Sequence, residues 1–160
     1  MRQQKTLDTY EDVKEKALRL LEFRSHSEKE LKDKLMRCGA SGENIEQTLD
    51  FCRRYGFVND AEYAKAKARD LLNLKKLGLR RICGELKNKG ISDELISEAI
   101  YELDLDGIED TLNKLVRNKL RNDFSDKNIN KCIRYFLYRG YDLKDIRACI
   151  NDIVYGGLSD

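Results

Sequence analysis

The sequence contains no proline and no tryptophan among its 160 residues. The absence of proline removes the commonest helix breaker from the whole chain. Charged residues make up 38% of the sequence, and its apolar residues recur mostly at three- and four-residue spacing. Both features favour an all-α protein over a protein built on a β-sheet.

Metal-ligating side chains are also scarce. His26 is the only histidine, and the five cysteines form no Cys-X-X-Cys pair. We therefore expect no metal site, no cofactor and no disulfide framework, but reduced thiols in a cytoplasmic protein. Residues 1–16 contain no apolar segment typical of a secretory signal, and no apolar run is long enough to cross a bilayer. No membrane contact is expected.

The net charge of +2 conceals a segregated pattern. Residues 65–90 contain nine Lys/Arg and two Asp/Glu, and residues 111–139 contain eight and two. Between them, residues 91–110 contain eight acidic residues and no basic one. Two basic segments therefore flank an acidic one, although protein surfaces normally intersperse their charges.

Glycines divide the chain at intervals of about fifty residues, at Gly39, Gly90 and Gly140. Each is suited to the left-handed position that ends a helix. A good helix N-cap residue stands two positions after each glycine: Ser41, Ser92 and Asp142. The pattern predicts a helix, a glycine turn and a second helix in each of three units.

Apolar residues occupy equivalent positions around the three glycines, at spacings that place them on one face of each helix. The expected core positions before the glycines are Leu31, Leu35, Ile82, Leu86, Cys132 and Phe136. Those after the glycines are Ile45, Leu49, Ile96, Ile100, Ile146 and Ile150.

A further amphipathic helix precedes each pair, so the sequence predicts three three-helix units. The expected helices span residues 9–23, 28–38, 42–55, 60–75, 79–89, 93–103, 107–120, 126–139 and 143–155. The predicted fold is all-α, with tandem three-helix repeats at 1–58, 59–104 and 105–160 stacked into an elongated, curved array.

Two short segments have the form of helix-capping boxes, Ser27–Glu30 and Asn59–Glu62. Asp60 is expected to cap the fourth helix together with Asn59. Arg24 is a candidate to anchor that junction through a carboxylate, which the sequence does not identify. His26, in the same turn, is expected to be structural or exposed rather than catalytic.

Three stretches of the sequence, "RSHSEKELKDKL", "GFVNDAEYAKAKARD" and "LGLRRICGELKNKGIS", together resemble the RecX family. The matching positions are Arg24, Ser27, Glu30, Leu31, Leu35, Gly56, Asn59, Asp60, Tyr63, Ala64, Arg69, Gly78, Ile82, Glu85, Leu86, Lys89, Gly90 and Ile91. The resemblance is clear over residues 17–103 and looser over the third unit.

The resemblance implies a regulatory protein without enzymatic activity. Proteins of this family regulate the bacterial recombinase RecA, and they lodge in the helical groove of the RecA–single-stranded DNA filament. They inhibit or modulate filament growth, strand exchange and the co-protease activity that triggers the SOS response. The implied partner is thus the RecA nucleoprotein filament, in homologous recombination and DNA repair, and a monomer is expected.

The basic segments contain the candidate contacts with the filament or with DNA phosphates. Two of their stripes lie at helical spacing: Lys65, Arg69 and Lys76 in one, and Lys127, Lys131 and Arg134 in the other. The remaining candidates are Lys75, Arg80, Arg81, Lys87, Lys89, Lys114, Arg117, Lys119 and Arg121. The alternative interpretation is a solvated helix face with ordinary ion pairs, and the sequence does not decide between the two.

The other polar and aromatic features of these segments have structural interpretations. The acidic residues 93–110 suit helix N-termini and pairing with neighbouring cations, or else meet basic surface on the filament. Phe136 is expected in the core, whereas Tyr138 is the better candidate for exposure and base stacking.

Direct binding of single- or double-stranded DNA by a helical-repeat protein is the alternative function. An enzyme is not expected, because no phosphate-binding glycine loop, metal-ligand cluster or nucleophile–histidine pattern is present.

Overall fold

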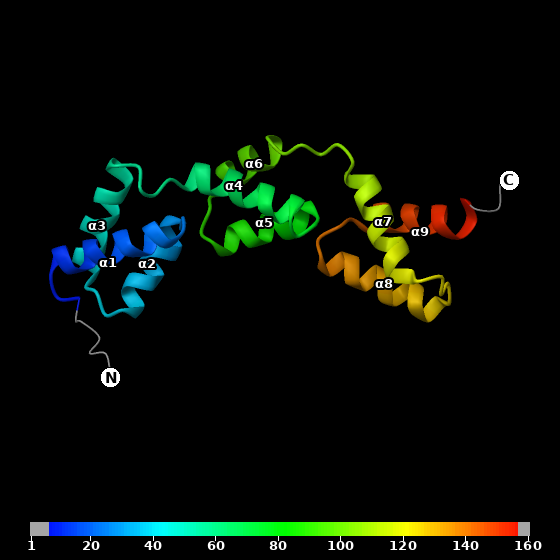
Figure 1. Cartoon of the computed structure of the whole chain (residues 1–160), viewed down its shortest axis with the longest axis horizontal. Coiled ribbons are helices and arrows are strands. Elements are labelled where there is room, and N and C mark those ends of the chain that lie inside the picture. The colour runs from blue at the N-terminus through cyan, green and yellow to red at the C-terminus, as the bar shows by residue number, and fades with distance from the viewer. Residues whose placement is uncertain (1–6, 157–160) are drawn as a thin grey trace. The chain divides into compact units, whose positions relative to one another are not determined.

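The computed structural model describes residues 7–156, which form nine α-helices and no β-strand. Figure 1 traces them in chain order. The predicted all-α fold is confirmed, and each helix begins and ends within two residues of its predicted bounds. The helices are α1 Tyr10–Phe23, α2 Glu28–Arg37, α3 Gly42–Arg54, α4 Asp60–Asn73, α5 Leu79–Asn88, α6 Asp93–Tyr101, α7 Ile108–Leu120, α8 Asp126–Tyr138 and α9 Leu143–Tyr155. None of the helices in this described part is long and apolar enough to cross a membrane.

The glycine turns have the geometry that the sequence predicted. Gly39, Gly90 and Gly140 all have positive φ, at 85°, 77° and 93°, in the left-handed region that glycine adopts without steric cost. The Ser41 hydroxyl accepts a hydrogen bond from the amide of Asn44, so the cap that follows the first glycine is formed.

The chain divides into two compact units. Unit 1 comprises Met1–Ala66 with Leu86–Ala99, and unit 2 comprises Lys67–Glu85 with Ile100–Asp160. In unit 1, α1, α2 and α3 pack against one another around a buried core that includes Leu31, Leu35 and Ile45. The exact limits of the three predicted repeats stay a prediction.

Unit 2 contains the corresponding trio α7, α8 and α9, which also pack against one another. Its core includes the predicted positions Cys132, Phe136, Ile146 and Ile150, all at most 5% exposed. The middle helices also carry predicted core residues. Three of these are buried, namely Ile82, Leu86 and Ile96, whereas Ile100 is half-buried.

Within unit 1, the turn before α2 contacts the turn after α5. The Ser27 hydroxyl donates to the Lys89 carbonyl at 2.6 Å and accepts from the Glu30 amide at 3.2 Å. Gly90 lies so close that a Cβ there would come within 2.6 Å of the Lys29 Cβ. We call this contact the first junction, because it joins residues of the first predicted repeat to residues of the second.

Within unit 2, the turn before α5 contacts the turn after α8 in the same manner. The Gly78 amide donates to the Arg139 carbonyl at 2.9 Å, and the Arg80 amide donates to the Gly140 carbonyl at 3.3 Å. A Cβ on Gly78 would lie 2.3 Å from the backbone of Gly140. We call this contact the second junction.

One capping prediction is wrong, and a second holds in its position but not in its side-chain hydrogen bond. Asn59 caps α4 as expected, since its side-chain oxygen accepts from the Glu62 amide at 3.2 Å. Asp60 does not cap α4 with it, because its carboxylate accepts from the Glu28 amide at 2.8 Å and so caps α2. Asp142 stands at the N-cap of α9 without a side-chain capping bond, because its carboxylate pairs with Arg80 at 2.7 Å.

Candidate functional site

The first junction contains a cluster of charged groups around Glu30, whose side chain is only 12% exposed. Arg24 donates to both carboxylate oxygens, at 2.9 and 3.1 Å, and Lys89 donates at 2.8 Å. These hydrogen bonds lower the pKa of Glu30 to about 2, and the contribution from Arg24 is the largest. The carboxylate partner of Arg24 is therefore Glu30, and Lys89 has a structural role.

His26 is buried beside this cluster, as its expected structural role requires. Its Nδ1 lies 2.9 Å from the Arg24 carbonyl, and its Nε2 lies 2.9 Å from the Lys34 ammonium. A carbonyl only accepts and an ammonium only donates, so these partners select the neutral imidazole with its proton on Nδ1. Burial lowers the pKa of His26, which also favours the neutral form.

Several candidate cations of residues 65–90 are engaged in ion pairs. Arg80 pairs with Asp142, Arg81 with Glu85 and Lys87 with Asp93, at 2.7, 2.9 and 2.9 Å. Lys65 and Arg69 lie on α4, and Lys75 and Lys76 lie exposed in the connection that follows it. Arg80, Arg81 and Lys87 therefore each have a carboxylate partner within the chain, and Lys89 belongs to the first junction. Contact of these cations with a filament or with DNA stays a prediction.

The candidate cations of the third predicted repeat are arranged differently. All of them are exposed on α7, on α8 or just after α7, and none has a carboxylate partner among residues 7–156. They are Lys114, Arg117, Lys119, Arg121, Lys127, Lys131 and Arg134. Unpaired charge of one sign on two packed helices is what an acidic surface or a phosphate backbone would bind.

One aromatic ring connects the cations of α7 to those of α8. The ammonium of Lys119 lies 4.0 Å from the centre of the Tyr135 ring, and the Arg139 guanidinium lies 5.7 Å from the same ring. The Lys119 contact joins the end of α7 to α8, whereas Arg139, which directly follows α8, contacts a ring of the helix it ends. Tyr138 is 71% exposed, as predicted, but the Arg81 guanidinium lies 4.8 Å from its ring.

The core of unit 2 fixes the helices that carry these cations. Leu112 and Val116 of α7 pack with Cys132 and Phe136 of α8, all buried. Ser125 caps α8 by accepting from the Asn128 amide at 3.4 Å. The cations of each helix therefore project from rigid elements rather than from loops.

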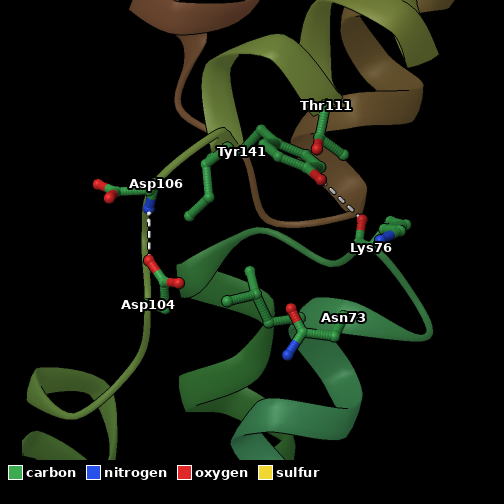
Figure 2. Close-up of a pocket in the computed structure, with 8 residues that line it drawn as sticks. Asn73, Lys76, Asp104, Asp106, Thr111 and Tyr141 are labelled. Carbon is green, nitrogen blue, oxygen red and sulfur yellow. Dashed lines mark hydrogen bonds between the residues drawn. The ribbon is translucent and has the colours of Figure 1, made fainter.

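A small polar cavity lies elsewhere in unit 2, between the end of α4, the α6–α7 connection and Tyr141 (Figure 2). The Tyr141 hydroxyl donates to the Lys76 carbonyl at 2.7 Å, and the Asp106 amide donates to the Asp104 carboxylate at 3.0 Å. The cavity has a volume of about 50 Å³, which suits water rather than an organic ligand.

The described part of the chain contains no group of three or more His, Cys, Asp or Glu side chains that could hold a metal ion. All five cysteines are free. Burial raises the pKa of the thiols of Cys52, Cys132 and Cys149, which disfavours the reactive thiolate.

The fold defines a helical-repeat protein with a cationic surface on α7 and α8, and comparisons with known proteins identify its family. Residues 14–52 match the family model "RecX, first three-helix domain", and residues 59–100 match "RecX, second three-helix domain". Together these segments cover half of the chain. The chain belongs to the RecX family.

Relatives named "Regulatory protein RecX" agree with this assignment. That of Clostridioides difficile (strain 630) is 42% identical over 100 residues, covering 62% of this chain and 46% of that protein. That of Vibrio vulnificus (strain CMCP6) is 36% identical over 96 residues, covering 60% and 62%. The matched region thus spans less than two thirds of these relatives.

The crystal structure of RecX from Lactobacillus salivarius has the same fold. It superposes with a TM-score of 0.76 at 21% identity, over 90% of this chain and 96% of that one. A second crystal structure, of a regulatory protein RecX, gives a TM-score of 0.75 at 22% identity, over 89% and 73%.

Proposed function

We propose that this protein is a regulator that binds the RecA–single-stranded DNA filament in its helical groove and restrains it. Membership of the RecX family carries the proposal, because the curated relatives are named as regulatory proteins. The restrained activities are filament growth, strand exchange and co-protease action. No chemical step by the protein itself is required.

The unpaired cations of α7 and α8 are the contact surface in this proposal. A nucleoprotein filament presents phosphates and acidic protein side chains, both of which attract Lys and Arg. The cations of residues 80–89 contribute less to the proposed contact, because most of their charge is compensated within the chain. Rigid helices also limit the entropy lost on binding.

A pull-down with three forms of bait tests the proposal: RecA assembled on single-stranded DNA, free RecA and bare single-stranded DNA. We expect retention on the assembled filament at concentrations where the other two retain little. We also expect a falling rate of DNA-dependent ATP hydrolysis by RecA as the protein is titrated in. No retention on the filament together with unchanged hydrolysis would contradict the proposal.

Direct action on DNA is the second candidate, favoured by the exposed Tyr138 beside basic helices. Salt distinguishes the two candidates. A protein that binds DNA alone loses affinity steeply between 50 and 200 mM salt, by about 10³-fold or more for six phosphate contacts, whether or not RecA is present. Equal retention on bare DNA and on the filament, with this salt dependence, would favour direct binding.

A further inference from the structure

His26 lies in the turn between α1 and α2, and its side chain is only 2% exposed. Its Nδ1 lies 2.9 Å from the Arg24 carbonyl oxygen, and its Nε2 lies 2.9 Å from the ammonium nitrogen of Lys34. An ammonium group only donates hydrogen bonds, so Nε2 has to accept one and carries no proton. A second proton on the ring would therefore point at a positive charge, in a place that is shielded from water.

The surroundings of the ring oppose a positive charge on it. Arg24 and Lys34 are both cations, and the next residue, Ser27, is the N-cap of α2. The N-terminus of a helix carries a partial positive charge, which disfavours a cation beside it. Burial is the main cause of the lowered pKa of His26, and the charges of Arg24 and Lys34 lower it further. The hydrogen bond to the Arg24 carbonyl and the charge of Glu30 act in the opposite direction without reversing this shift.

The other ionisable groups near this turn come from α2, from α4 and from the turn after α5. Glu30 has a pKa of about 2, and burial is the main cause that raises the pKa of Tyr63 to about 12, so neither changes its charge between pH 5 and 8. Asp60 of α4 caps α2, and Lys89 donates to Glu30. Histidine is the side chain whose ordinary pKa lies between pH 5 and 8. A change of the first junction within this interval is therefore assigned to His26.

The turn that holds the ring is also the turn that forms the first junction. Ser27 directly follows His26, and its hydroxyl donates to the Lys89 carbonyl at 2.6 Å. A protonated ring needs an acceptor or water at Nε2, and it reaches water only by leaving its place beside Lys34. Because the ring and Ser27 belong to adjacent residues, this movement displaces the contact with Lys89. We propose that His26 is a pH-sensitive switch: a proton taken up at Nε2 expels the ring from its buried site and opens the first junction.

The direction and the size of the effect follow from proton linkage. The closed junction keeps the ring neutral, whereas an exposed ring in the open junction has the ordinary pKa of about 6.5. Opening is therefore rare above pH 7 and becomes more frequent as the pH falls below about 6.5. For an exposed ring with this pKa and a closed state that stays neutral, the opening constant rises about tenfold from pH 7.5 to 5.5. The proposal does not depend on the proposed RecA partner.

Two measurements on the full chain test the switch. His26 is the only histidine of the sequence, so the imidazole resonances in an NMR titration report its protonation directly. We expect their midpoint below pH 6.5. Hydrogen exchange at the amides of Glu30 and Leu31, which donate to the Ser27 hydroxyl and carbonyl, reports the opening. Relative to unstructured peptides at the same pH, we expect their protection to fall about tenfold from pH 7.5 to 5.5.

The amide of Ile45, which donates to the Ser41 carbonyl at the start of α3, is the control within unit 1. We expect its protection to change less than about twofold over the same interval, because local opening leaves α3 in place. Unfolding of the whole unit would instead expose Ile45 and Leu31 together.

His26→Gln removes the titration and keeps the hydrogen-bonding capacity, since the amide side chain has one oxygen that accepts from Lys34 and one NH₂ group that can donate. We expect the protection of Leu31 in this variant to be independent of pH from 7.5 to 5.5, whatever its absolute value. Circular dichroism verifies that the variant remains helical.

Lys34→Met provides a second test that does not replace the histidine. Loss of the ammonium group that faces Nε2 is expected to raise the midpoint of the His26 titration towards 6.5 and to reduce the pH dependence at Leu31. Lys32→Met is the matched control on the same helix, because Lys32 pairs with Glu46 at 2.5 Å. We expect it to leave the His26 midpoint unchanged.

Four outcomes would overturn the proposal. The first is a midpoint of the wild-type His26 titration at or above 6.5. The second is the same pH dependence at Leu31 in the wild type and in His26→Gln. The third is an equal loss of protection at Ile45 and Leu31. The fourth is an equal His26 midpoint in Lys34→Met and Lys32→Met, which decides the matter even if His26→Gln does not fold.

Discussion

The first and second junctions use equivalent turns but different chemistry. In the first, Glu30 lies between Arg24 and Lys89, with N–O distances of 2.8 to 3.1 Å. The positions equivalent to Glu30 and Lys89 in the second junction are Arg81 and Arg139. Two cations there cannot form the same ion pair, so the second junction needs another source of attraction.

The ion pair at the second junction, Arg80–Asp142, is exposed, with side chains 77% and 52% accessible, so it contributes little. Backbone contacts and an aromatic residue take the place of the buried ion cluster there. The Arg139 side chain donates to the carbonyls of Lys75 and Lys76, and the Tyr141 hydroxyl also donates to that of Lys76. Lys76 has a left-handed backbone with φ of 53°, so these bonds hold a conformation that is unusual for lysine. The comparison indicates that both junctions share the turn geometry, whereas their side-chain chemistry is replaceable.

The largest expected effect comes from adding one carbon to the second junction. In Gly78→Ala, the new Cβ would lie 2.3 Å from the backbone of Gly140, which cannot move as a flexible side chain can. We expect a loss of about 2–3 kcal/mol in local stability, in the upper part of the range for overpacking a tight contact. Hydrogen exchange at the amides of Arg81 and Ile82, which donate to the Gly78 carbonyl, would report it.

Gly84→Ala is the matched control, since Gly84 lies within α5 and a Cβ there meets nothing within 4 Å. It should be neutral or stabilising by up to about 1 kcal/mol, because alanine favours a helix over glycine. If Gly78→Ala behaved like Gly84→Ala, the second junction would not depend on close backbone approach.

Acid is expected to weaken the first junction more than the second. The folded-state pKa of Glu30, about 2, lies below its ordinary value of 4.5. Its contribution is therefore present above about pH 5 and is lost as the pH falls towards 2. Arg24 is 44% exposed, so after allowance for solvent screening we expect a loss of about 1–2 kcal/mol. Burial lowers the pKa of His26, so the folded state keeps this side chain neutral. The unfolded chain binds the proton more readily, and the folded state therefore also loses stability at this residue as the pH falls below about 6.5.

Hydrogen exchange at the Leu31 amide, which donates to the Ser27 carbonyl, would follow the first junction with pH. The amide of Ile82 would follow the second, where the hydrogen bonds come from backbone, tyrosine and arginine groups and the ion pair Arg80–Asp142 is exposed. Glu30→Gln should weaken the first junction at pH 7 and reduce its further loss in acid. Equal acid sensitivity at Leu31 and Ile82 would contradict the distinction.

A smaller effect is expected from Tyr141→Phe. The substitution removes one hydroxyl, which donates to the Lys76 carbonyl at 2.7 Å, and keeps the ring against Phe136 at 5.9 Å. We expect a loss of about 1 kcal/mol, typical of one hydrogen bond, measured by chemical denaturation or local exchange at the second junction. A loss above about 3 kcal/mol would show that the ring packing had changed as well.

The helices were predictable from the sequence, because each end carries a local signal. Gly39, Gly90 and Gly140 mark helix ends, and Ser27 and Ser41 mark helix starts. The core positions were also predictable, since burial follows helical periodicity. The family found by comparison is also the one that the three quoted stretches of sequence resemble.

Contacts between distant residues were not predictable from local patterns. Asp60 resembles a cap for its own helix, yet it caps α2, thirty-two positions earlier in the sequence. Lys89 and Arg80 look like surface cations, although each pairs with a carboxylate brought close only by the fold. No spacing within a single helix distinguishes such residues from the exposed cations of α8.

Local patterns also do not reveal the apolar groove of about 230 Å³ between α8 and α9, which is lined by Ile129, Ile133, Ile150 and Val154, because isoleucines at this spacing are typical of any amphipathic helix. Ile133 directly follows the core residue Cys132, and it is half-buried, as is Ile129 one turn earlier. A position-by-position comparison with Glu28 and Lys32 of the first repeat would have revealed the change from charged to apolar.

The most direct test of the functional account compares filament binding by two charge-reversed variants. The first replaces Lys127, Lys131 and Arg134 of α8 with Glu, and the control replaces Arg19, Arg37 and Arg54 of the first repeat with Glu, giving the same net charge. Affinity for RecA assembled on single-stranded DNA is measured at one salt concentration. We expect the α8 variant to bind at least about tenfold more weakly, roughly 1.4 kcal/mol, and the control to remain within about threefold of the wild type. Equal affinities of the two folded variants would contradict the assignment of the contact surface to the third repeat.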